Sequence, residues 1–208
     1  VHESQSRIYE NQLGRSRAFA GWLFGEMRAA FGDFGIDDPQ TFHASVNRVT
    51  DSFIRTEADE VQYNLHVMLR FDLEQALMRG DLTVGDLEAA WNDRFLADFG
   101  YPVDKPANGV LQDVHWATGQ FGTFCNYTVG NVVAAQLFDA AQGEADVRAG
   151  LAQAEYTPLR HWLGQHVMRH GRRYVRDELL QMATGRPIDP EPYLTHLTTR
   201  FRDAYRLH

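Results

Sequence analysis

The first residues of the chain, VHESQSR, place a histidine and a glutamate, His2 and Glu3, side by side. These residue types begin the zinc-binding pattern HEXXH, in which two histidines one helical turn apart hold the metal and the glutamate acts as general base. The fifth position of that pattern is Ser6 here. The stretch lacks the second histidine, so it cannot by itself supply the three protein ligands that a catalytic zinc needs.

A second stretch with chemical potential is residues 110–131, VLQDVHWATGQFGTFCNYTVGN. It is rich in glycine, aromatic and polar residues and has neither a helical nor a strand period, which predicts a loop. Loops carry function more often than helices do. His115 in this stretch could donate a hydrogen bond to a peptide carbonyl or to a tetrahedral intermediate. Taken alone, it is better explained as a structural loop histidine.

A third pair, His166 and His170, has the i,i+4 spacing of metal ligands in HVMRH. No glutamate lies between them to act as general base, and Arg169 would repel a cation. Histidines in the last turn of a helix interact favourably with its negative end. We therefore interpret this pair as structural.

The elements that must position these residues are predicted to be helices. Apolar residues recur at three- and four-residue spacing in stripes that predict amphipathic helices. The first is expected to begin close to residue 1. Caps and first-turn prolines mark other helix starts, and glycines mark helix ends. The stripes lie within residues 19–31, 61–77, 87–95, 159–167 and 194–205; the starts are Asp38-Pro39, Thr83 with Asp86, Thr157-Pro158 and Asp189-Pro190; the stops are Gly80, Gly171 and Gly185.

Length and composition limit the class of protein. A chain of 208 residues with 44% hydrophobic residues is long enough for one domain or for part of a larger enzyme. The net charge of −8 argues against nucleic acid and anionic membranes as partners. The single cysteine, Cys125, fits a reducing compartment. No apolar run approaches the roughly 20 residues of a membrane span. We expect one all-α domain, a multi-helix array over residues 1–208 with at most a minor hairpin.

Three segments together resemble one family. They are HESQSRIYENQLGRSRAF (residues 2–19), IRTEADEVQYNLHVMLRFDLE (54–74) and GVLQDVHWATGQFGTFCNYTVGNVVAAQLFDAA (109–141). They are similar to the C-terminal half of the carboxypeptidase Taq family of zinc metallocarboxypeptidases. The family's HES/GQ motif corresponds to residues 2–5, and its QDxHW motif to residues 112–116. The similarity runs over essentially the whole chain.

The resemblance implies that the chain is a fragment. In the family, the HEXXH helix precedes the HES/GQ motif, and this chain starts too late to contain it. The implied partners are therefore the missing N-terminal half carrying HEXXH, peptide substrates and a second subunit of a homodimer, with no nucleic acid or membrane. The implied cofactor is Zn²⁺, or another divalent metal such as Co²⁺, in the full-length protein. The family is typically cytoplasmic. The isolated chain is expected to be metal-free at that site and inactive.

The resemblance also implies roles at the start of the chain. Glu3 becomes the third zinc ligand; without the motif, it would be interpreted as a solvated glutamate interacting with the helix dipole. His2 becomes a residue that supports the ligands or touches substrate, although it could equally be a frayed terminal residue. Arg7, one turn after Glu3, could hold the ligand carboxylate, or form an ordinary surface ion pair.

In the second and third segments the implied roles concern substrate. His115 and Tyr127 would stabilise the oxyanion, with a buried core tyrosine as the alternative for Tyr127. Gln112 of QDxHW would contact substrate. A carboxypeptidase must bind a free carboxylate, and the fork of Arg55 fits it; the alternative is a salt bridge to Glu57 or Asp59.

The activity implied for the full-length protein is hydrolysis of the last peptide bond, with broad specificity. His66, among apolar neighbours in mid-helix, is expected to be a core histidine. The alternative function is a non-catalytic helical module that binds peptides or dimerises. The residues encoded upstream of Val1 discriminate between them, since an HEXXH there favours the enzyme.

Overall fold

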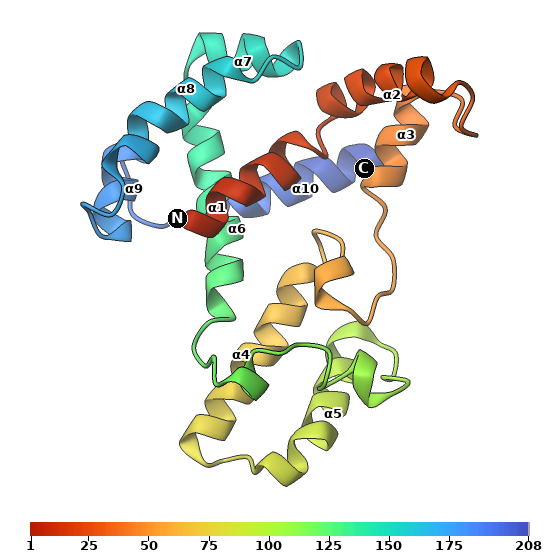
Figure 1. The fold of residues 1–208 in the computed structure, drawn as a ribbon, viewed down its shortest axis with the longest axis vertical. Coiled ribbons are helices and arrows are strands. Elements are labelled where there is room, and N and C mark those ends of the chain that lie inside the picture. The colour runs from red at the N-terminus through yellow and green to blue at the C-terminus, as the bar shows by residue number, and fades with distance from the viewer. Residues whose placement is uncertain (208) are drawn as a thin grey trace. The chain divides into compact units, whose positions relative to one another are not determined.

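The computed structural model describes residues 1–207, and the regular elements in this range are all helical (Figure 1). The ten α-helices, with no strand between residues 1 and 207, confirm the all-α prediction. None of these helices is long and apolar enough to cross a membrane. The α-helices are α1 (His2–Arg7), α2 (Arg17–Phe31), α3 (Pro39–Val46), α4 (Tyr63–Arg79), α5 (Leu87–Phe99), α6 (Cys125–Ala141), α7 (Ala145–Ala152), α8 (Thr157–His166), α9 (Arg176–Thr184) and α10 (Glu191–Tyr205).

The residues gather into two compact units, and the single domain expected over residues 1–208 stays a prediction. Unit 1 combines residues 1–48 with the residues from 129 onward, and unit 2 is the continuous segment 49–128. Each has its own apolar core. The two units are therefore described one at a time.

The core of unit 1 is built around α6. Val133, Ala134 and Leu137 of this helix are fully buried, and they pack with Leu159 and Leu163 from α8. The other buried members of the cluster come from the start of the chain, the end of α6 and the segment from α7 to α9: Ile8, Leu13, Ala141, Val147, Trp162, Val167, Leu179 and Leu180. Burial of these side chains holds the helices together, because each fully buried leucine, isoleucine or valine contributes about 1.5–3 kcal/mol.

The core of unit 2 is formed by α4 and α5. Leu69 and Leu73 of α4 meet Trp91 and Phe95 of α5, and all four are buried. The ring of Tyr101 packs edge-on against Phe95 at 5.3 Å between centroids. The segment 100–110 is thereby drawn onto the helix pair.

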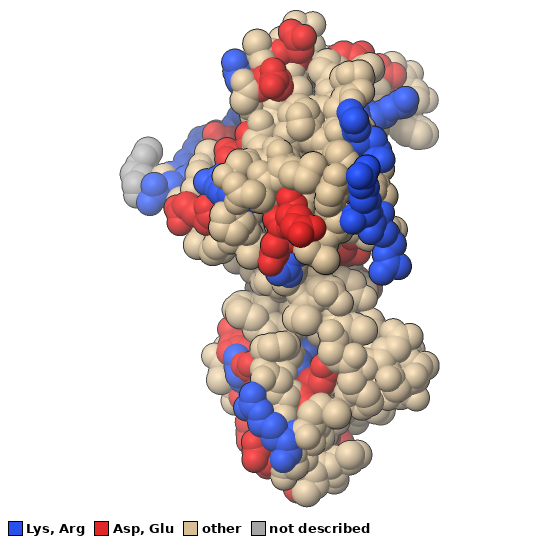
Figure 2. Space-filling model, turned by 90° about the vertical axis from the view of Figure 1, so that its left-hand side faces the viewer, with Lys and Arg blue, Asp and Glu red and all other residues tan. Residues whose placement is uncertain are grey.

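Exposed ion pairs contribute less than these cores. On the face drawn in Figure 2, acidic and basic side chains both occur in each unit, with basic ones gathered along one edge of unit 1. Arg94, for example, pairs with Asp72 and Asp98 at 2.7 Å, and Arg17 pairs with Asp203. Pairs this exposed are worth about 0–1 kcal/mol each.

The predicted helix starts and stops are largely confirmed. Asp38 accepts hydrogen bonds from the main-chain N–H groups of Gln40 and Thr41 at the start of α3. Gly80 and Gly185 end α4 and α9 in the left-handed conformation that glycine adopts without strain.

The prediction of one helix from the opening residues to residue 31 is wrong. After α1 the chain forms a π-helix, Ile8–Leu13, and the helix then breaks at residues 14–16. Ser16 starts α2 by accepting a hydrogen bond from the N–H of Phe19 at 3.2 Å. A serine side chain satisfies an otherwise unpaired N–H at this position, so the break has a local cause in the sequence.

The irregular stretch 110–131 is also shorter than predicted. A 3₁₀ turn occupies Trp116–Thr118, and α6 begins at Cys125. The last seven residues of the stretch are therefore helical. Gly130, a residue type that favours a loop in the sequence pattern, lies inside α6 and is buried there.

Candidate active site

Glu3 lies in the first turn of α1 and is held by Arg7. The Nε of Arg7 donates to Oε1 of Glu3 at 3.0 Å, and its Nη1 donates to Glu10 Oε2 at 2.9 Å. The side chain of Glu3 is 31% exposed and that of Arg7 is 13% exposed. The i,i+4 contact expected from the sequence is thus formed, and it orients a carboxylate that remains accessible.

A close approach of α6 fixes the other side of Glu3. A Cβ built on Gly130 would lie 2.6 Å from Cγ and 2.9 Å from Cβ of Glu3. These atoms are near the main chain and cannot swing away as the end of a long side chain does. Glycine at position 130 therefore lets α1 and α6 come together at the carboxylate.

We predict that Gly130→Ala lowers the free energy of unfolding by about 1–3 kcal/mol, as overpacking of a closed contact does. The matched control is Gly164→Ala in α8, where a Cβ would meet nothing within 4 Å. That change should be neutral or stabilise by up to about 1 kcal/mol, because alanine favours helix. Urea unfolding of both variants measures the difference, and equal effects would show that the approach at Gly130 is not tight.

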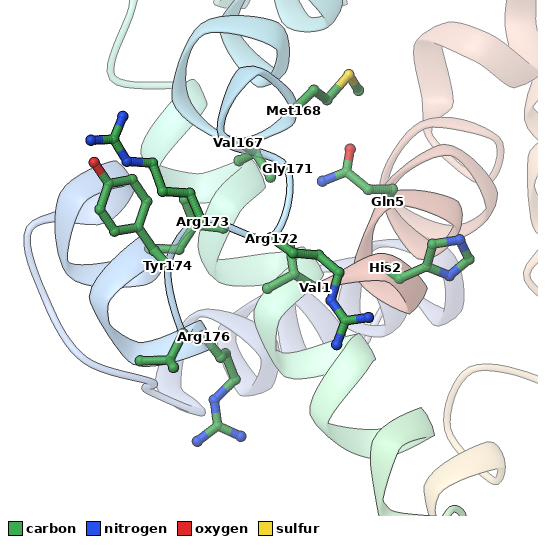
Figure 3. A pocket seen from close by; sticks show the side chains of 12 residues that line it. Val1, His2, Gln5, Val167, Met168, Gly171, Arg172, Arg173, Tyr174 and Arg176 are labelled. Carbon is green, nitrogen blue, oxygen red and sulfur yellow. The ribbon is translucent and has the colours of Figure 1, made fainter.

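His2 faces a different side of α1 from Glu3. It lines a cavity of about 870 Å³ in unit 1, whose wall includes Gln5, Arg172 and Arg176 (Figure 3). Residues three positions apart, such as His2 and Gln5, lie on the same face of a helix, whereas the adjacent residue Glu3 lies on another. The structure therefore does not place the imidazole beside the carboxylate of Glu3.

Metal-ligating side chains do not cluster within the described chain. Between residues 1 and 207, no group of three or more His, Cys, Asp or Glu side chains is arranged to hold a metal ion. The pair in HVMRH does not share an α-helix, because α8 ends at His166 and His170 belongs to a separate 3₁₀ turn. His166 instead stacks on Trp162 at 4.4 Å and pairs with its carbonyl oxygen. This arrangement supports the structural interpretation of the pair.

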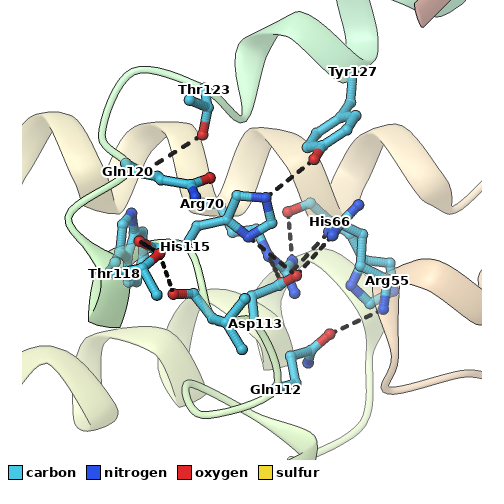
Figure 4. A network of polar contacts seen from close by, with 12 residues as sticks. Arg55, His66, Arg70, Gln112, Asp113, His115, Thr118, Gln120, Thr123 and Tyr127 are labelled. Carbon is cyan, nitrogen blue, oxygen red and sulfur yellow. Dashed lines mark hydrogen bonds and ion pairs between the residues drawn. The ribbon is translucent and has the colours of Figure 1, made fainter.

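In unit 2, Asp113 lies between two arginines (Figure 4). Nη2 of Arg55 donates to Oδ1 at 2.7 Å, and Nε of Arg70 donates to Oδ2 at 2.6 Å. Burial acts to raise the pKa of Asp113, but the hydrogen bonds and charges of Arg55 and Arg70 outweigh it, so the pKa lies below its usual range. Asp113 is therefore a carboxylate at neutral pH.

Arg55 has its partners inside the protein. It is 5% exposed, its fork is directed at Asp113, and its Nη1 donates to the Tyr63 hydroxyl at 3.1 Å. Its guanidinium also lies 4.7 Å from the ring centre of Tyr127. The salt bridge considered with Glu57 or Asp59 is thus replaced by one with Asp113. Binding of a substrate carboxylate by Arg55 stays a prediction, and it would have to compete with Asp113.

Gln112 connects this network to the main chain. Its Oε1 accepts from the N–H of Arg55 at 2.9 Å, and its Nε2 donates to the carbonyl oxygens of Phe53 and Asn108. These hydrogen bonds use the side-chain amide of Gln112 to hold the segment around Arg55 against the loop after α5. Its predicted contact with substrate stays a prediction.

His115 and Tyr127, twelve residues apart, are brought into contact. Nε2 of His115 lies 3.0 Å from the Tyr127 hydroxyl. Burial lowers the pKa of His115; the charge of Asp113 opposes this, and the charges of Arg55 and Arg70 add to it. The imidazole is therefore neutral at neutral pH. The pair shares one hydrogen bond and has one further proton, either on the Tyr127 hydroxyl or on Nδ1 of His115.

Glu74 holds the loop that carries His115. Its two oxygens accept from Nε1 of Trp116 at 2.7 Å and from the N–H of Gly122 at 2.6 Å. Because Glu74 is itself buried in α4, the tryptophan of the QDxHW motif is fixed to a helix. This explains why an irregular segment can present His115 in a defined position.

His66 is a core histidine, as predicted. It is fully buried and packs against Phe99 at 4.5 Å between ring centres. Burial, with the neighbouring charge of Arg70, lowers its pKa to about 3. It is neutral at physiological pH and fills space in unit 2.

Three network residues were not predicted from the sequence: Arg70, Asp113 and Glu74. Asp113 lay within a quoted motif without an assigned role. Arg70 and Glu74 had a visible signal, because they continue the buried face of α4 that includes Leu73. A charged residue at a core position of a helix requires a buried partner.

The amino-acid sequence is similar to one family of known proteins. The sequence profile of the carboxypeptidase Taq (M32) metallopeptidases matches residues 1–201. Thermostable carboxypeptidase 1 of Thermus thermophilus is 40% identical over 206 residues, which is 99% of this chain and 40% of that protein. Carboxypeptidase 1 of Bacillus subtilis is 34% identical over 212 residues, 100% of this chain and 42% of that protein.

The fold is similar to solved structures of the same family. The crystal structure of an M32 carboxypeptidase from Deinococcus radiodurans R1 superposes with a TM-score of 0.94 at 41% identity, covering 100% of this chain and 42% of the other. Trypanosoma cruzi metallocarboxypeptidase 1 superposes with a TM-score of 0.91 at 36% identity, covering 97% of this chain and 41% of the other. The chain thus spans about 40% of the length of the relatives that it matches.

Proposed function

Because the chain belongs to the carboxypeptidase Taq (M32) metallopeptidase family, we propose that it is the C-terminal part of a zinc-dependent carboxypeptidase that removes residues one at a time from the C-terminus of peptides, with broad specificity. The observation that carries the proposal is the family match over residues 1–201. The anchored carboxylate of Glu3 and the contact between His115 and Tyr127 support it.

Glu3 is the proposed metal ligand. A catalytic zinc takes three protein ligands and keeps one open position, and the carboxylate of Glu3 is accessible, oriented by Arg7 and backed by Gly130. The family match supports the proposal that the other two ligands come from an HEXXH segment outside this chain. Zn²⁺, or another divalent ion such as Co²⁺, would lower the pKa of a bound water and polarise the scissile carbonyl.

The residues of unit 2 are proposed to act on the substrate. His115 and Tyr127 would stabilise the oxyanion that forms at the scissile carbonyl, because a preorganised donor is worth most where negative charge develops. Arg55 and Arg70 share one carboxylate, so with Asp113 they carry a net positive charge. That charge would favour a substrate with a free terminal carboxylate.

The assembly and its location are also proposals. We propose a cytoplasmic homodimer that requires the N-terminal half of the protein for activity, and we expect the 208-residue chain alone to be inactive. The chain supplies one proposed zinc ligand of three, which is the reason for that expectation.

The test uses the intact protein and two peptides of one sequence, one with a free and one with an amidated C-terminus. Release of the terminal amino acid from the free peptide alone, loss of this activity with a chelator and its return with Zn²⁺ or Co²⁺ would support the proposal. Equal cleavage of both peptides, or activity that resists metal removal, would contradict it. The 208-residue chain serves as the inactive control.

A further inference from the structure

His115 makes a hydrogen bond through one ring nitrogen. Its Nε2 meets the Tyr127 hydroxyl at 3.0 Å, whereas its buried Nδ1 has no hydrogen-bond partner among the described residues. The nearest carboxylate oxygen, Oδ1 of Asp113, is 3.7 Å from Nδ1, which is too long for a hydrogen bond. The position of the ring proton therefore determines the direction of the bond to Tyr127.

The two possible directions have different consequences. If Nε2 carries the proton, it donates to the Tyr127 oxygen, and the phenol proton is left to be donated to another group. If Nδ1 carries the proton, Nε2 accepts the phenol proton, and Tyr127 has no donor to offer. Only the first arrangement lets Tyr127 donate to an oxyanion.

Asp113 is the group that could draw the proton onto Nδ1, since a carboxylate beside an imidazole nitrogen favours N–H at that nitrogen. Here both of its oxygens are occupied, by Arg55 at 2.7 Å and by Arg70 at 2.6 Å (Figure 4). The charges of Arg55 and Arg70 therefore oppose the pull of Asp113 on the ring proton of His115.

Arg70 is placed so that it cannot release Asp113. It is fully buried, its Nη1 donates to the carbonyl oxygen of His66 at 2.7 Å, and its guanidinium lies 4.6 Å from the ring centre of Trp91. An arginine fixed at three points holds its carboxylate in one position. Arg55 approaches Asp113 from a second direction.

We propose that Arg70 is a positioning residue: by holding Asp113 away from His115, it keeps the ring proton on Nε2 and leaves the Tyr127 hydroxyl free to donate to substrate. The assignment of Arg70 rests on the geometry of this chain, and the role of Tyr127 rests on the proposed function. Arg70 itself touches no substrate and acts through Asp113 and His115.

The other groups around His115 do not compete for Nδ1. Phe124 covers the ring at 4.5 Å between centroids. The negative charge of Glu74 is directed at Trp116 and Gly122. Burial lowers the pKa of His115, so the ring is neutral near pH 7 and has a single proton to place.

The test is a ¹⁵N–¹H long-range correlation spectrum of the ¹⁵N-labelled 208-residue chain at neutral pH, with His115 assigned from its absence in His115→Gln. We expect a protonated Nε2 and an unprotonated Nδ1 in the wild-type chain. A protonated Nδ1 in the wild type would overturn the proposal without any variant.

Variants test the cause. Arg70→Met should move the proton to Nδ1, and Arg70→Met with Asp113→Asn should return it to Nε2, because the double variant also removes the carboxylate. Arg94→Met, which removes an exposed arginine of the same unit, should change nothing. If circular dichroism shows that Arg70→Met is unfolded, Arg70→Gln, which keeps a donor and removes the charge, replaces it. A proton that stays on Nε2 in the folded single variant would refute the role of Arg70.

Activity of the intact protein separates this inference from the proposed function. Arg70→Met should lower kcat about 100-fold with little change in KM, as loss of an oxyanion donor does, and the double variant should recover part of it. If the spectra behave as expected but the intact protein releases no terminal amino acid, the positioning role stands and the proposed function fails. If the spectra do not show the expected positions of the ring proton, the positioning role fails, whatever the activity of the intact protein.

Discussion

Glu3→Gln in the intact protein should remove the bound zinc and lower kcat/KM by at least about 100-fold. The estimate is a lower bound, because residues that merely support a metal ligand already contribute 10–100-fold. Glutamine keeps the size of the side chain and its contact with Gly130 but loses the negative charge that a zinc ligand supplies. Metal content by mass spectrometry and release of a C-terminal amino acid measure the two effects.

Glu10→Gln is the matched control. Glu10 pairs with the same arginine, Arg7, at 2.9 Å, but its side chain is half exposed. Loss of that pair should leave both zinc and activity within about twofold, since exposed pairs contribute little. If Glu3→Gln keeps metal and activity, or if the two variants behave alike, Glu3 is not the ligand.

Asp113→Ala should cost about 3–5 kcal/mol of stability, because it leaves two buried guanidinium groups without their carboxylate. Arg70 is fully buried and Arg55 nearly so, so neither can turn to water without opening the core of unit 2. Urea unfolding of the 208-residue chain, followed by circular dichroism, gives the change in free energy.

Asp72→Ala provides the comparison for this change. Asp72 also accepts from an arginine in unit 2, Arg94 at 2.7 Å, but its side chain is 48% exposed. The expected cost is within about 0.5 kcal/mol. A cost for Asp113→Ala no larger than that for Asp72→Ala would mean that the arginines find other partners, and that the buried network does not stabilise unit 2.

The helices were predictable where local chemistry sets them. Asp38 before Pro39, or Gly80 after an apolar stripe, determines a helix boundary through groups a few residues apart. Gly130 is different, because the need for a glycine at this position of α6 comes from Glu3, which is far away in sequence. A pattern read along the chain contains no information about such a contact, so it treats this glycine as a sign of a loop.

In the candidate site, too, contacts between residues close in sequence were predictable and contacts between distant residues were not. The contact of Arg7 with Glu3 follows from helical spacing, and the sequence sufficed for it. The partner of Arg55 does not follow from the sequence, because spacing favours the nearby acidic residues, whereas the actual partner, Asp113, is 58 positions along the chain. Pairing across such distances depends on how the 3₁₀ turn Arg55–Glu57 packs against the loop after α5, and no short pattern records it.

The insertion of unit 2 within unit 1 has a consequence for the order in which the chain folds. Unit 2 is continuous, so all of its residues have been synthesised once residue 128 has left the ribosome. Unit 1 must wait, because Arg17 pairs with Asp203, 186 positions later, and Arg200 donates to the carbonyl oxygen of Gln12. Closing such long loops is slow. During translation, α1 to α3 therefore keep apolar surface uncovered until α6 to α10 arrive, and this is the interval in which a chaperone would be most useful.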